Sequence, residues 1–284
     1  MTSVTGGTGA ASAGTLPPIR TSDREARLAG GEPAPAPPWF EEVPSDGPVW
    51  PRVARQLSDH GVAGLRLPAP LGAQDFLDFG RRLGRPIPES DPAIAEFVEH
   101  DVLLNLRGES RSAAVALAPF TTGELTLHTE GSRRPADRQP RYIVLMCLEP
   151  GLAAGAQTLL VPASAVLAAL APAAAETLRH TRERVVAGTP TVLRDQDGAQ
   201  VFSFRDLGDE PFHWESTAGE EAVTVALTAL IEACYTVSPL YGVRWQRGDL
   251  LVIDNHRWFH GRSRGRRSAG DRIRHLQRLR VAGA

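Results

Sequence analysis

The sequence predicts a mainly β protein, a double-stranded β-helix (jelly roll) with peripheral helices. Short apolar runs rich in Val, Ile and Leu dominate the centre and the end of the chain, and irregular segments separate them. Stretches with apolar residues at helical spacing lie before and between these runs. With 284 residues, of which 42% are hydrophobic, the chain can fill one substantial core.

The period of the apolar residues predicts each helix and strand. In the helix over 74–83, Phe76, Phe79 and Leu83 lie on one stripe. Before the strand over 250–253, the sequence Arg247-Gly248-Asp249 favours a turn. The expected elements, in full, are helices over 53–60, 74–83, 164–179 and 220–234, and strands over 61–67, 102–106, 125–128, 142–148, 158–161, 201–204, 250–253 and 276–281.

Composition divides the chain into two parts. Residues 1–45 are rich in Thr, Ser, Gly, Ala and Pro and offer little apolar surface to bury. This composition predicts a flexible, low-complexity leader. Residues 46–284 are expected to form a single domain, because their apolar runs continue to the end without a second low-complexity segment.

Charge and cysteine usage narrow the class of protein. The 31 basic and 33 acidic residues leave a formal net charge of -2, so we expect no nucleic-acid partner and no membrane partner. Cys147 and Cys234 lie among apolar neighbours, which is typical of buried thiols in a reducing compartment. The chain shows no secretory signal and no apolar run that could span a bilayer, which predicts a cytoplasmic protein.

His128, Glu130 and His260 form the candidate metal site. Side chains at positions i and i+2 of an extended strand point to one face, so His128 and Glu130 can reach the same ion. His260 follows the apolar strand over 250–253, and Gly261 beside it is expected to leave room for a neighbouring ligand. Two imidazoles and one carboxylate hold a non-haem Fe(II) on one face and leave the opposite positions open. The same ligands with a bound water also describe a hydrolytic zinc centre.

Several ordered motifs accompany these residues: Glu124-Leu125-Thr126-Leu127-His128-Thr129-Glu130, Gly155-Ala156-Gln157-Thr158, Gly248-Asp249-Leu250-Leu251-Val252-Ile253-Asp254-Asn255, His260-Gly261-Arg262 and Arg274-His275-Leu276-Gln277-Arg278. With them the chain resembles the Fe(II)/2-oxoglutarate-dependent dioxygenases of the taurine dioxygenase-like superfamily, specifically the clavaminate synthase-like branch with its asparagine and arginine oxygenases of antibiotic biosynthesis. The resemblance implies that His128, Glu130 and His260 are the iron ligands. It also implies that 2-oxoglutarate and O2 are co-substrates and that residues 46–284 are the dioxygenase domain.

The resemblance implies a site for 2-oxoglutarate as well. This dicarboxylate chelates the metal through its keto-acid end, so its far carboxylate needs a partner, and a planar guanidinium suits that role. Arg274 lies at the spacing after His260 that the branch uses for this guanidinium. Thr158 corresponds to the hydroxyl that shares the same carboxylate.

Substrate contacts follow from the same resemblance. Arg278 corresponds to the residue that binds a substrate carboxylate, and Glu130 would lie close to the substrate amine. Asp206 and Asp209 fall where relatives place acids that hold a polar or basic substrate side chain. Residues 131–135 replace a stretch that is commonly aromatic in the family, so the substrate pocket is expected to differ there.

The first expectation for function is hydroxylation of an unactivated C–H, at C3, of a free amino acid or an amino-acid-derived natural-product precursor, with release of succinate and CO2. Desaturation, cyclisation or epoxidation would use the same ligands, and so would the oxidation of a substrate tethered to a carrier protein. A hydrolytic zinc enzyme and a non-catalytic β-sandwich binding protein are two further classes that the pattern leaves open. Arg274 and Thr158 favour the oxygenase over the zinc enzyme, because a hydrolase has no need to bind a dicarboxylate.

Overall fold

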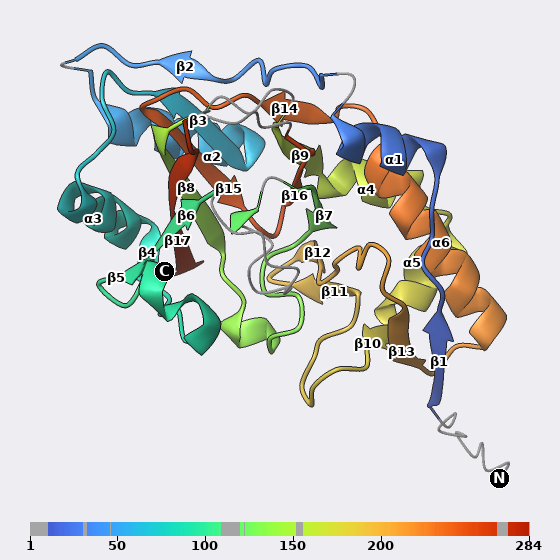
Figure 1. Ribbon diagram of the computed structural model, residues 1–284. Coiled ribbons are helices and arrows are strands. Elements are labelled where there is room, and N and C mark those ends of the chain that lie inside the picture. Colours follow the sequence, from blue (N-terminus) through green and yellow to red (C-terminus); the bar gives the residue numbers. More distant parts are fainter. Residues whose placement is uncertain are drawn as a thin grey trace, which may run out of the picture.

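The computed structural model describes residues 11–30, 33–45, 47–108, 120–121, 123–151, 156–265 and 272–283. Two β-sheets lie at its centre (Figure 1). The larger sheet follows the order β2 (Glu41–Glu42), β3 (Val62–Arg66), β15 (Asp249–Asp254), β8 (Tyr142–Glu149), β17 (His275–Gly283), β6 (Leu103–Arg107) and β5 (Val98–Glu99), with β4 (Gly84–Pro86) also paired to β17. The smaller sheet follows the order β14 (Tyr241–Val243), β9 (Thr158–Pro162), β16 (Trp258–Arg262) and β7 (Leu125–His128).

Both sheets are covered on both faces, which explains why their strands read as continuous apolar runs. In β8, Ile143 and Leu145 belong to the core between the two sheets, together with Leu160 of the smaller sheet. The alternate residues Val144 and Met146 face the opposite side. Helices α2 (Val49–His60) and α3 (Ala73–Leu83) pack against that side.

A second group of helices covers the outer face of the smaller sheet, on the opposite side of the molecule from α2 and α3 (Figure 1). Leu159 and Phe259 of that sheet pack against Leu227 and Leu230. The group comprises α1 (Ser22–Ala29), α4 (Ala163–Ala169), α5 (Pro172–Arg179) and α6 (Glu220–Thr236). The sequence predicts α4 and α5 as one helix, but Pro172 begins a new helix because it cannot donate the backbone hydrogen bond that continuation requires.

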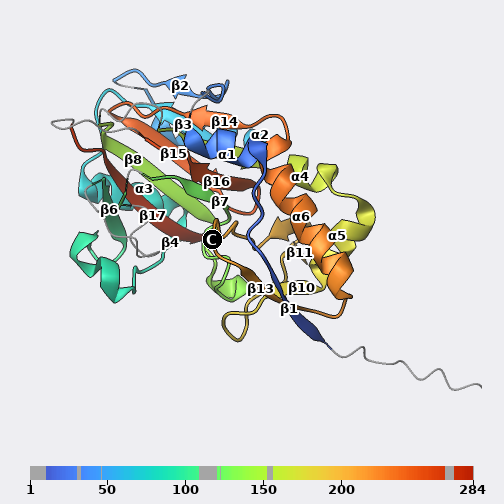
Figure 2. The ribbon, with the colours of Figure 1, turned by 45° about the vertical axis from the view of Figure 1, so that its right-hand side comes forward.

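The expectation of a flexible leader over 1–45 is wrong for the part of it that the structure describes. Strand β1 (Ser12–Leu16) pairs with β13 (Phe212–Ser216), as Figure 2 shows. Gly14 makes this possible, since a Cβ there would lie 2.3 Å from the Trp214 ring. Leu16 and Leu28 are buried in the main helical core. Residues 1–10 and 31–32 lie outside the described residues.

Smaller elements complete the fold. β13 also pairs with β10 (Thr181–Glu183), and β11 (Leu193–Gln196) forms a hairpin with β12 (Ala199–Phe202), two residues earlier than the predicted strand over 201–204. Short 3-10 turns cover Pro92–Phe97 and Ala136–Arg138.

None of the helices among the described residues is long and apolar enough to cross a membrane. Both cysteines are buried free thiols, as predicted, while the compartment stays a prediction.

Candidate metal centre

Adjacent strands bring the two predicted histidines together. His128 at the end of β7 lies directly opposite His260 of β16 in the antiparallel register, and their ring centroids are 4.3 Å apart. Gly261 allows this approach for a different reason from the one expected. A Cβ on Gly261 would lie 2.7 Å from the Leu125 carbonyl oxygen, so the glycine makes room for the backbone of β7 and not for a ligand.

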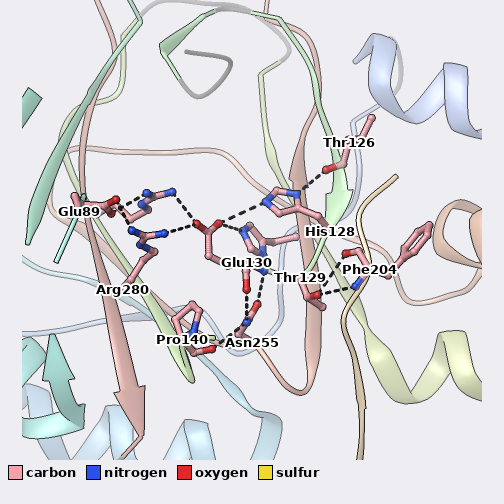
Figure 3. Close-up of polar contacts among 11 residues, drawn as sticks. Glu89, Thr126, His128, Thr129, Glu130, Pro140, Phe204, Asn255 and Arg280 are labelled. Carbon is pink, nitrogen blue, oxygen red and sulfur yellow. Dashed lines mark hydrogen bonds and ion pairs between the residues drawn. The ribbon is translucent and has the colours of Figure 1, made fainter. Parts of the chain in front are cut away.

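Glu130 completes the group although it lies beyond the end of β7. Thr129 fixes the backbone between His128 and Glu130 by two hydrogen bonds to Phe204. Its N–H donates to the Phe204 carbonyl oxygen at 2.9 Å, and its Oγ1 accepts from the Phe204 N–H at 3.1 Å. Glu130 Oε2 then lies 3.6 Å from His128 Nε2 and 3.8 Å from His260 Nε2. One potential ligand atom from each of the three residues falls within 4.8 Å of the others. Figure 3 shows Glu130 turned toward His128.

The protonation states suit a cation. His128 Nδ1 donates to the Thr126 carbonyl oxygen at 2.8 Å, which leaves the lone pair on Nε2, the atom that faces Glu130. Burial, together with the nearby His260, lowers the pKa of His128 to about 4, so the imidazole is neutral. Burial alone would raise the pKa of Glu130, but the charge of Arg278 and the contacts with both imidazoles lower it well below its ordinary value. These are the states in which imidazole and carboxylate bind metals.

A buried ion-pair network holds the other oxygen of Glu130 (Figure 3). Glu130 Oε1 lies 3.3 Å from Arg278 Nη1 and 3.6 Å from Arg280 Nη1. The second Nη atom of each arginine contacts Glu89, at 2.9 Å from Arg278 and 2.5 Å from Arg280. Both terminal nitrogens of Arg278 contact carboxylates, while its buried Nε has no hydrogen-bond partner among the described residues. Arg278 also lines the cavity, so its role in binding a substrate carboxylate stays a prediction.

Sequence reasoning missed Glu89. Its side chain is only 2% exposed, and its backbone N–H donates to the Asp101 carbonyl oxygen at 2.8 Å. Nearby, the N–H of Ile87 donates to the carbonyl oxygen of Arg280 at 2.7 Å, which ties this loop to β17. Only the long-range fold places this carboxylate beside the centre, so no local motif could have indicated it.

Asn255 fixes the turn that carries Glu130. Its Oδ1 accepts from the Glu130 N–H at 2.7 Å, and its Nδ2 donates to the carbonyl oxygens of Glu130 at 3.1 Å and Pro140 at 3.0 Å. The residue is 1% exposed, so these three groups would lose their partner out of reach of water if it were removed.

We expect Asn255→Ala to lower the affinity for Fe(II) by roughly 10- to 100-fold, as losses of supporting hydrogen bonds do at metal sites. Anaerobic Fe(II) titration measures this. The matched control is Asn105→Ala, which removes a buried amide of β6 that contacts Glu99 and Gln277 instead of the centre. The control should lose stability but keep its iron affinity. Equal iron affinities in the two variants would contradict the role given to Asn255.

The three candidate metal ligands line a cavity of about 260 Å³. Thr158 and Arg274, the predicted 2-oxoglutarate contacts, line the same cavity, and so does Arg262. Burial lowers the pKa of Arg274 to about 10, and burial together with the charge of Arg274 lowers the pKa of Arg262 to about 9. Two buried guanidinium groups, of which Arg274 disfavours the charge of Arg262, favour an anion at this end of the cavity.

Thr158 is prepared to donate a hydrogen bond at this anion site. Its Oγ1 accepts from the Trp245 indole N–H at 2.9 Å, so the hydroxyl hydrogen can point to another acceptor. The structure thus brings together five predicted residues, namely His128, Glu130, His260, Thr158 and Arg274. It adds Arg262, which belongs to one of the sequence motifs but for which the sequence predicts no role.

Asp206 and Asp209 do not line this cavity. Asp206 is buried and accepts hydrogen bonds from Arg24 Nε at 2.7 Å and from the Tyr235 hydroxyl at 2.7 Å. Asp209 is exposed and pairs with Arg20 at 2.8 Å. The structure therefore gives these acids no contact with the cavity beside the three candidate metal ligands, and their substrate role gains no support. Asp206 instead ties α1 to α6.

The two ion pairs of this region should differ sharply in their effect on stability. Arg24→Ala leaves the buried Asp206 without its counter-charge and should destabilise the protein by about 3–5 kcal/mol. Arg20→Ala removes a pair whose side chains are 62% and 73% exposed and should cost at most about 1 kcal/mol. Urea denaturation of both variants measures the difference. Similar midpoints would show that α1 does not belong to the cooperative domain.

The chain matches the model of a known protein family. The model of the taurine catabolism dioxygenase TauD, TfdA family matches residues 38–280, which is most of the chain and includes every residue of the metal centre. The chain belongs to the TauD/TfdA family. A curated relative of this TauD/TfdA chain is the 3-((Z)-2-isocyanoethenyl)-1H-indole synthase of Fischerella ambigua (strain UTEX 1903), 25% identical over 181 residues. The match covers 57% of the chain and 64% of that synthase, so the chain spans just under two thirds of the relative.

Solved structures of the same architecture confirm the jelly-roll fold of the TauD/TfdA chain. An asparagine oxygenase in complex with Fe(II), 2S,3S-3-hydroxyasparagine and succinate has a TM-score of 0.59 at 18% identity, over 81% of this chain and 77% of that one. PvcB, an Fe, alpha-ketoglutarate-dependent oxygenase from an isonitrile synthetic pathway, has a TM-score of 0.60 at 18% identity, over 99% and 94%. The non-heme iron oxygenase OrfP in complex with Fe and alpha-ketoglutaric acid has a TM-score of 0.59 at 18% identity, over 83% and 78%.

Proposed function

We propose that the protein is an Fe(II)- and 2-oxoglutarate-dependent oxygenase that oxidises an unactivated C–H of an amino acid or an amino-acid-derived small molecule. The observation that carries the proposal is the convergence of His128, Glu130 and His260 on the wall of a cavity that also presents Arg274 and Thr158. Two imidazoles and one ionised carboxylate on the wall of a cavity are a ligand set that fits Fe(II). Family membership supports the same chemistry.

Different residues of the cavity would bind the iron and 2-oxoglutarate. His128, Glu130 and His260 would hold the iron, and Arg274, Thr158 and Arg262 would bind the far carboxylate of 2-oxoglutarate. When bound, the iron supplies the redox chemistry by which 2-oxoglutarate and O2 yield succinate, CO2 and an oxidised substrate. The protein orients the reacting carbon, and the apolar side chains of Ile143, Leu145 and Leu276 keep that part of the cavity dry.

The substrate class rests on the relatives and on the size of the cavity. The asparagine oxygenase was crystallised with a hydroxylated asparagine, and an OrfP complex contains (3S)-hydroxy-L-Arg. A cavity of about 260 Å³ suits a small molecule of this kind beside 2-oxoglutarate. We therefore propose hydroxylation at C3 as the outcome, with desaturation, cyclisation or oxidation of a carrier-bound substrate as the alternatives that use the same ligands.

A hydrolytic zinc enzyme would use the same three ligands, but it has no need to bind a dicarboxylate at Arg274 and Thr158. A non-catalytic binding protein would have no reason to keep Glu130 ionised beside two imidazoles in a buried site. The anion site next to the triad is thus the feature that favours the oxygenase over both of these classes.

One assay separates these functions. The purified protein is loaded anaerobically with Fe(II) or Zn(II), given 2-oxoglutarate and a panel of amino acids and their derivatives, and then exposed to ¹⁸O₂. We expect succinate and a product carrying ¹⁸O with Fe(II) only. Succinate without labelled product would indicate desaturation or cyclisation. Turnover with Zn(II), or no succinate with Fe(II) and any panel member, would contradict the proposed function.

A further inference from the structure

The turn between β5 and β6 fixes the backbone of Glu89. His100 and Asp101 in this turn have φ angles of 52° and 62°, in the left-handed region that residues other than glycine rarely adopt. The Asp101 carbonyl oxygen accepts from the Glu89 N–H at 2.8 Å. Earlier in the same loop, Ile87 is bonded to β17. The turn and β17 thus hold the loop from two sides and set the position of the Glu89 carboxylate.

Glu89 is the nearer hydrogen-bond acceptor of two buried arginines. Arg280 Nη2 donates to Glu89 at 2.5 Å, and among the described residues its guanidinium makes no other hydrogen bond. Arg278 Nη2 donates to Glu89 at 2.9 Å, compared with 3.3 Å from its Nη1 to Glu130. Figure 3 shows the Arg280 guanidinium between the carboxylates of Glu89 and Glu130. Both arginines are therefore held closer to Glu89 than to the candidate metal ligand.

The charges of this buried group balance only with Glu89. Two carboxylates, Glu89 and Glu130, face the guanidinium groups of Arg278 and Arg280, and the four side chains are between 2% and 13% exposed. Asp91 is the remaining acid of the cavity wall, and among the described residues no ion pair joins it to either arginine. Without the charge of Glu89, two buried cations would share Glu130 alone, and a buried cation without its counter-charge is costly.

This sharing would affect the oxygen that faces the imidazoles. Glu130 Oε1 contacts the arginines, whereas Oε2 lies 3.6 Å from His128 Nε2 and 3.8 Å from His260 Nε2. A metal needs Oε2 with its lone pairs free. A guanidinium can bind both oxygens of one carboxylate, so two arginines that depend on Glu130 alone would compete with the metal for Oε2.

We propose that Glu89 is a positioning residue of the metal centre, which binds Arg278 and Arg280 so that Glu130 keeps Oε2 for the metal. The inference rests on the proposed function, because it concerns how the chain holds its Fe(II). Among the described residues Glu89 contacts neither imidazole, so it acts through the two arginines.

Anaerobic titration of the full chain with Fe(II) tests the proposal. Glu89→Gln keeps the shape of the side chain but removes its charge, and it should weaken Fe(II) binding by at least about tenfold, as losses of supporting contacts do at metal sites. The matched control is Glu183→Gln. Glu183 is a buried carboxylate that accepts from Arg133 at 2.6 Å and 3.0 Å, and it does not line the cavity. The control should lose stability but keep its Fe(II) affinity within about threefold, as expected for a distant site.

A second substitution separates the charge of Glu89 from a purely structural effect. Arg280→Gln removes one of the two cations, so the double variant Glu89→Gln/Arg280→Gln again holds one carboxylate and one guanidinium group. We expect the double variant to bind Fe(II) within about threefold of Arg280→Gln alone, whereas independent effects would leave it weaker by the full loss seen in Glu89→Gln. Removing Arg280 would not rescue a loss of packing.

Three results would overturn the proposal. They are a Glu89→Gln variant whose Fe(II) affinity falls by less than about tenfold, a double variant weaker than Arg280→Gln by more than about threefold, or a Glu183→Gln control that loses as much affinity as Glu89→Gln. If Glu89→Gln does not fold, the comparison of the double variant with Arg280→Gln decides. Failure of the proposed function is seen separately, as a wild-type protein that binds no Fe(II) or shows no iron-to-2-oxoglutarate absorption band.

Discussion

His128→Ala and His260→Ala should each abolish Fe(II)-dependent succinate formation while leaving the fold intact. Each substitution removes one of three ligands whose atoms lie within 4.8 Å of one another. The loss of iron affinity should exceed the roughly 10- to 100-fold that follows removal of a supporting hydrogen bond at a metal site. Anaerobic Fe(II) titration and a succinate assay measure the two effects.

His256→Ala is the matched control for these variants. His256 is a buried histidine close in sequence to His260, but its Nδ1 contacts Arg141 Nη1 at 2.8 Å and it does not line the cavity. We expect this variant to keep its iron affinity, with at most a loss of stability. Wild-type turnover in either His128→Ala or His260→Ala would reject the ligand assignment.

Arg274→Ala should raise the KM for 2-oxoglutarate by roughly 30-fold to more than 1,000-fold, since truncating one partner of a buried charge pair costs about 2–5 kcal/mol. The KM for the substrate should change little, because the far carboxylate of 2-oxoglutarate is the group that Arg274 is proposed to bind. Steady-state kinetics with each reactant varied in turn measures the split. The iron affinity without 2-oxoglutarate should stay the same.

Arg272→Ala provides the comparison for Arg274→Ala. Arg272 precedes Arg274 by two residues, but its side chain is 67% exposed and contacts Glu149 at 3.5 Å. Its removal should leave both KM values within about twofold of the wild type, as for other exposed ion pairs. If Arg274→Ala raised the two KM values equally, the anion site next to the triad would not be the 2-oxoglutarate site.

The fold was predictable from sequence because both sheets are buried on both faces. Strands such as β8 and β15 therefore appear as uninterrupted apolar runs with clear limits. The convergence of the three candidate metal ligands was predictable for a related reason. His128 and His260 each lie in or at the end of such a run, and the short step from His128 to Glu130 keeps both side chains on one side.

Substrate contacts were harder to predict, and the region of Asp206 shows why. Alternation along a strand-like segment means that an error of one residue exchanges the two faces. The sequence drew attention to the acid at 206, whereas Arg205 is the residue that faces the cavity. A loose resemblance cannot decide which of two neighbouring residues faces the cavity, but the backbone pairing with His128 does.

Contacts between residues far apart in the chain could not be predicted from any local sequence pattern. Glu89 reaches the centre only because its loop is bonded to β17, and β1 joins β13 across most of the chain. The composition of residues 1–45 correctly indicates few apolar residues, but Leu16, Leu28 and the Arg24–Asp206 pair suffice to anchor the described part of that segment. Composition describes an average, whereas anchoring depends on a few positions.

The convergence of three side chains on one ferrous ion is the claim on which every functional statement depends. A crystal structure grown anaerobically with Fe(II) and 2-oxoglutarate, with anomalous data at the iron edge, tests it most directly. We expect one anomalous peak bonded to His128 Nε2, Glu130 Oε2 and His260 Nε2, with the far carboxylate of 2-oxoglutarate at Arg274. An iron peak bound to other residues, or no iron at these three, would contradict it.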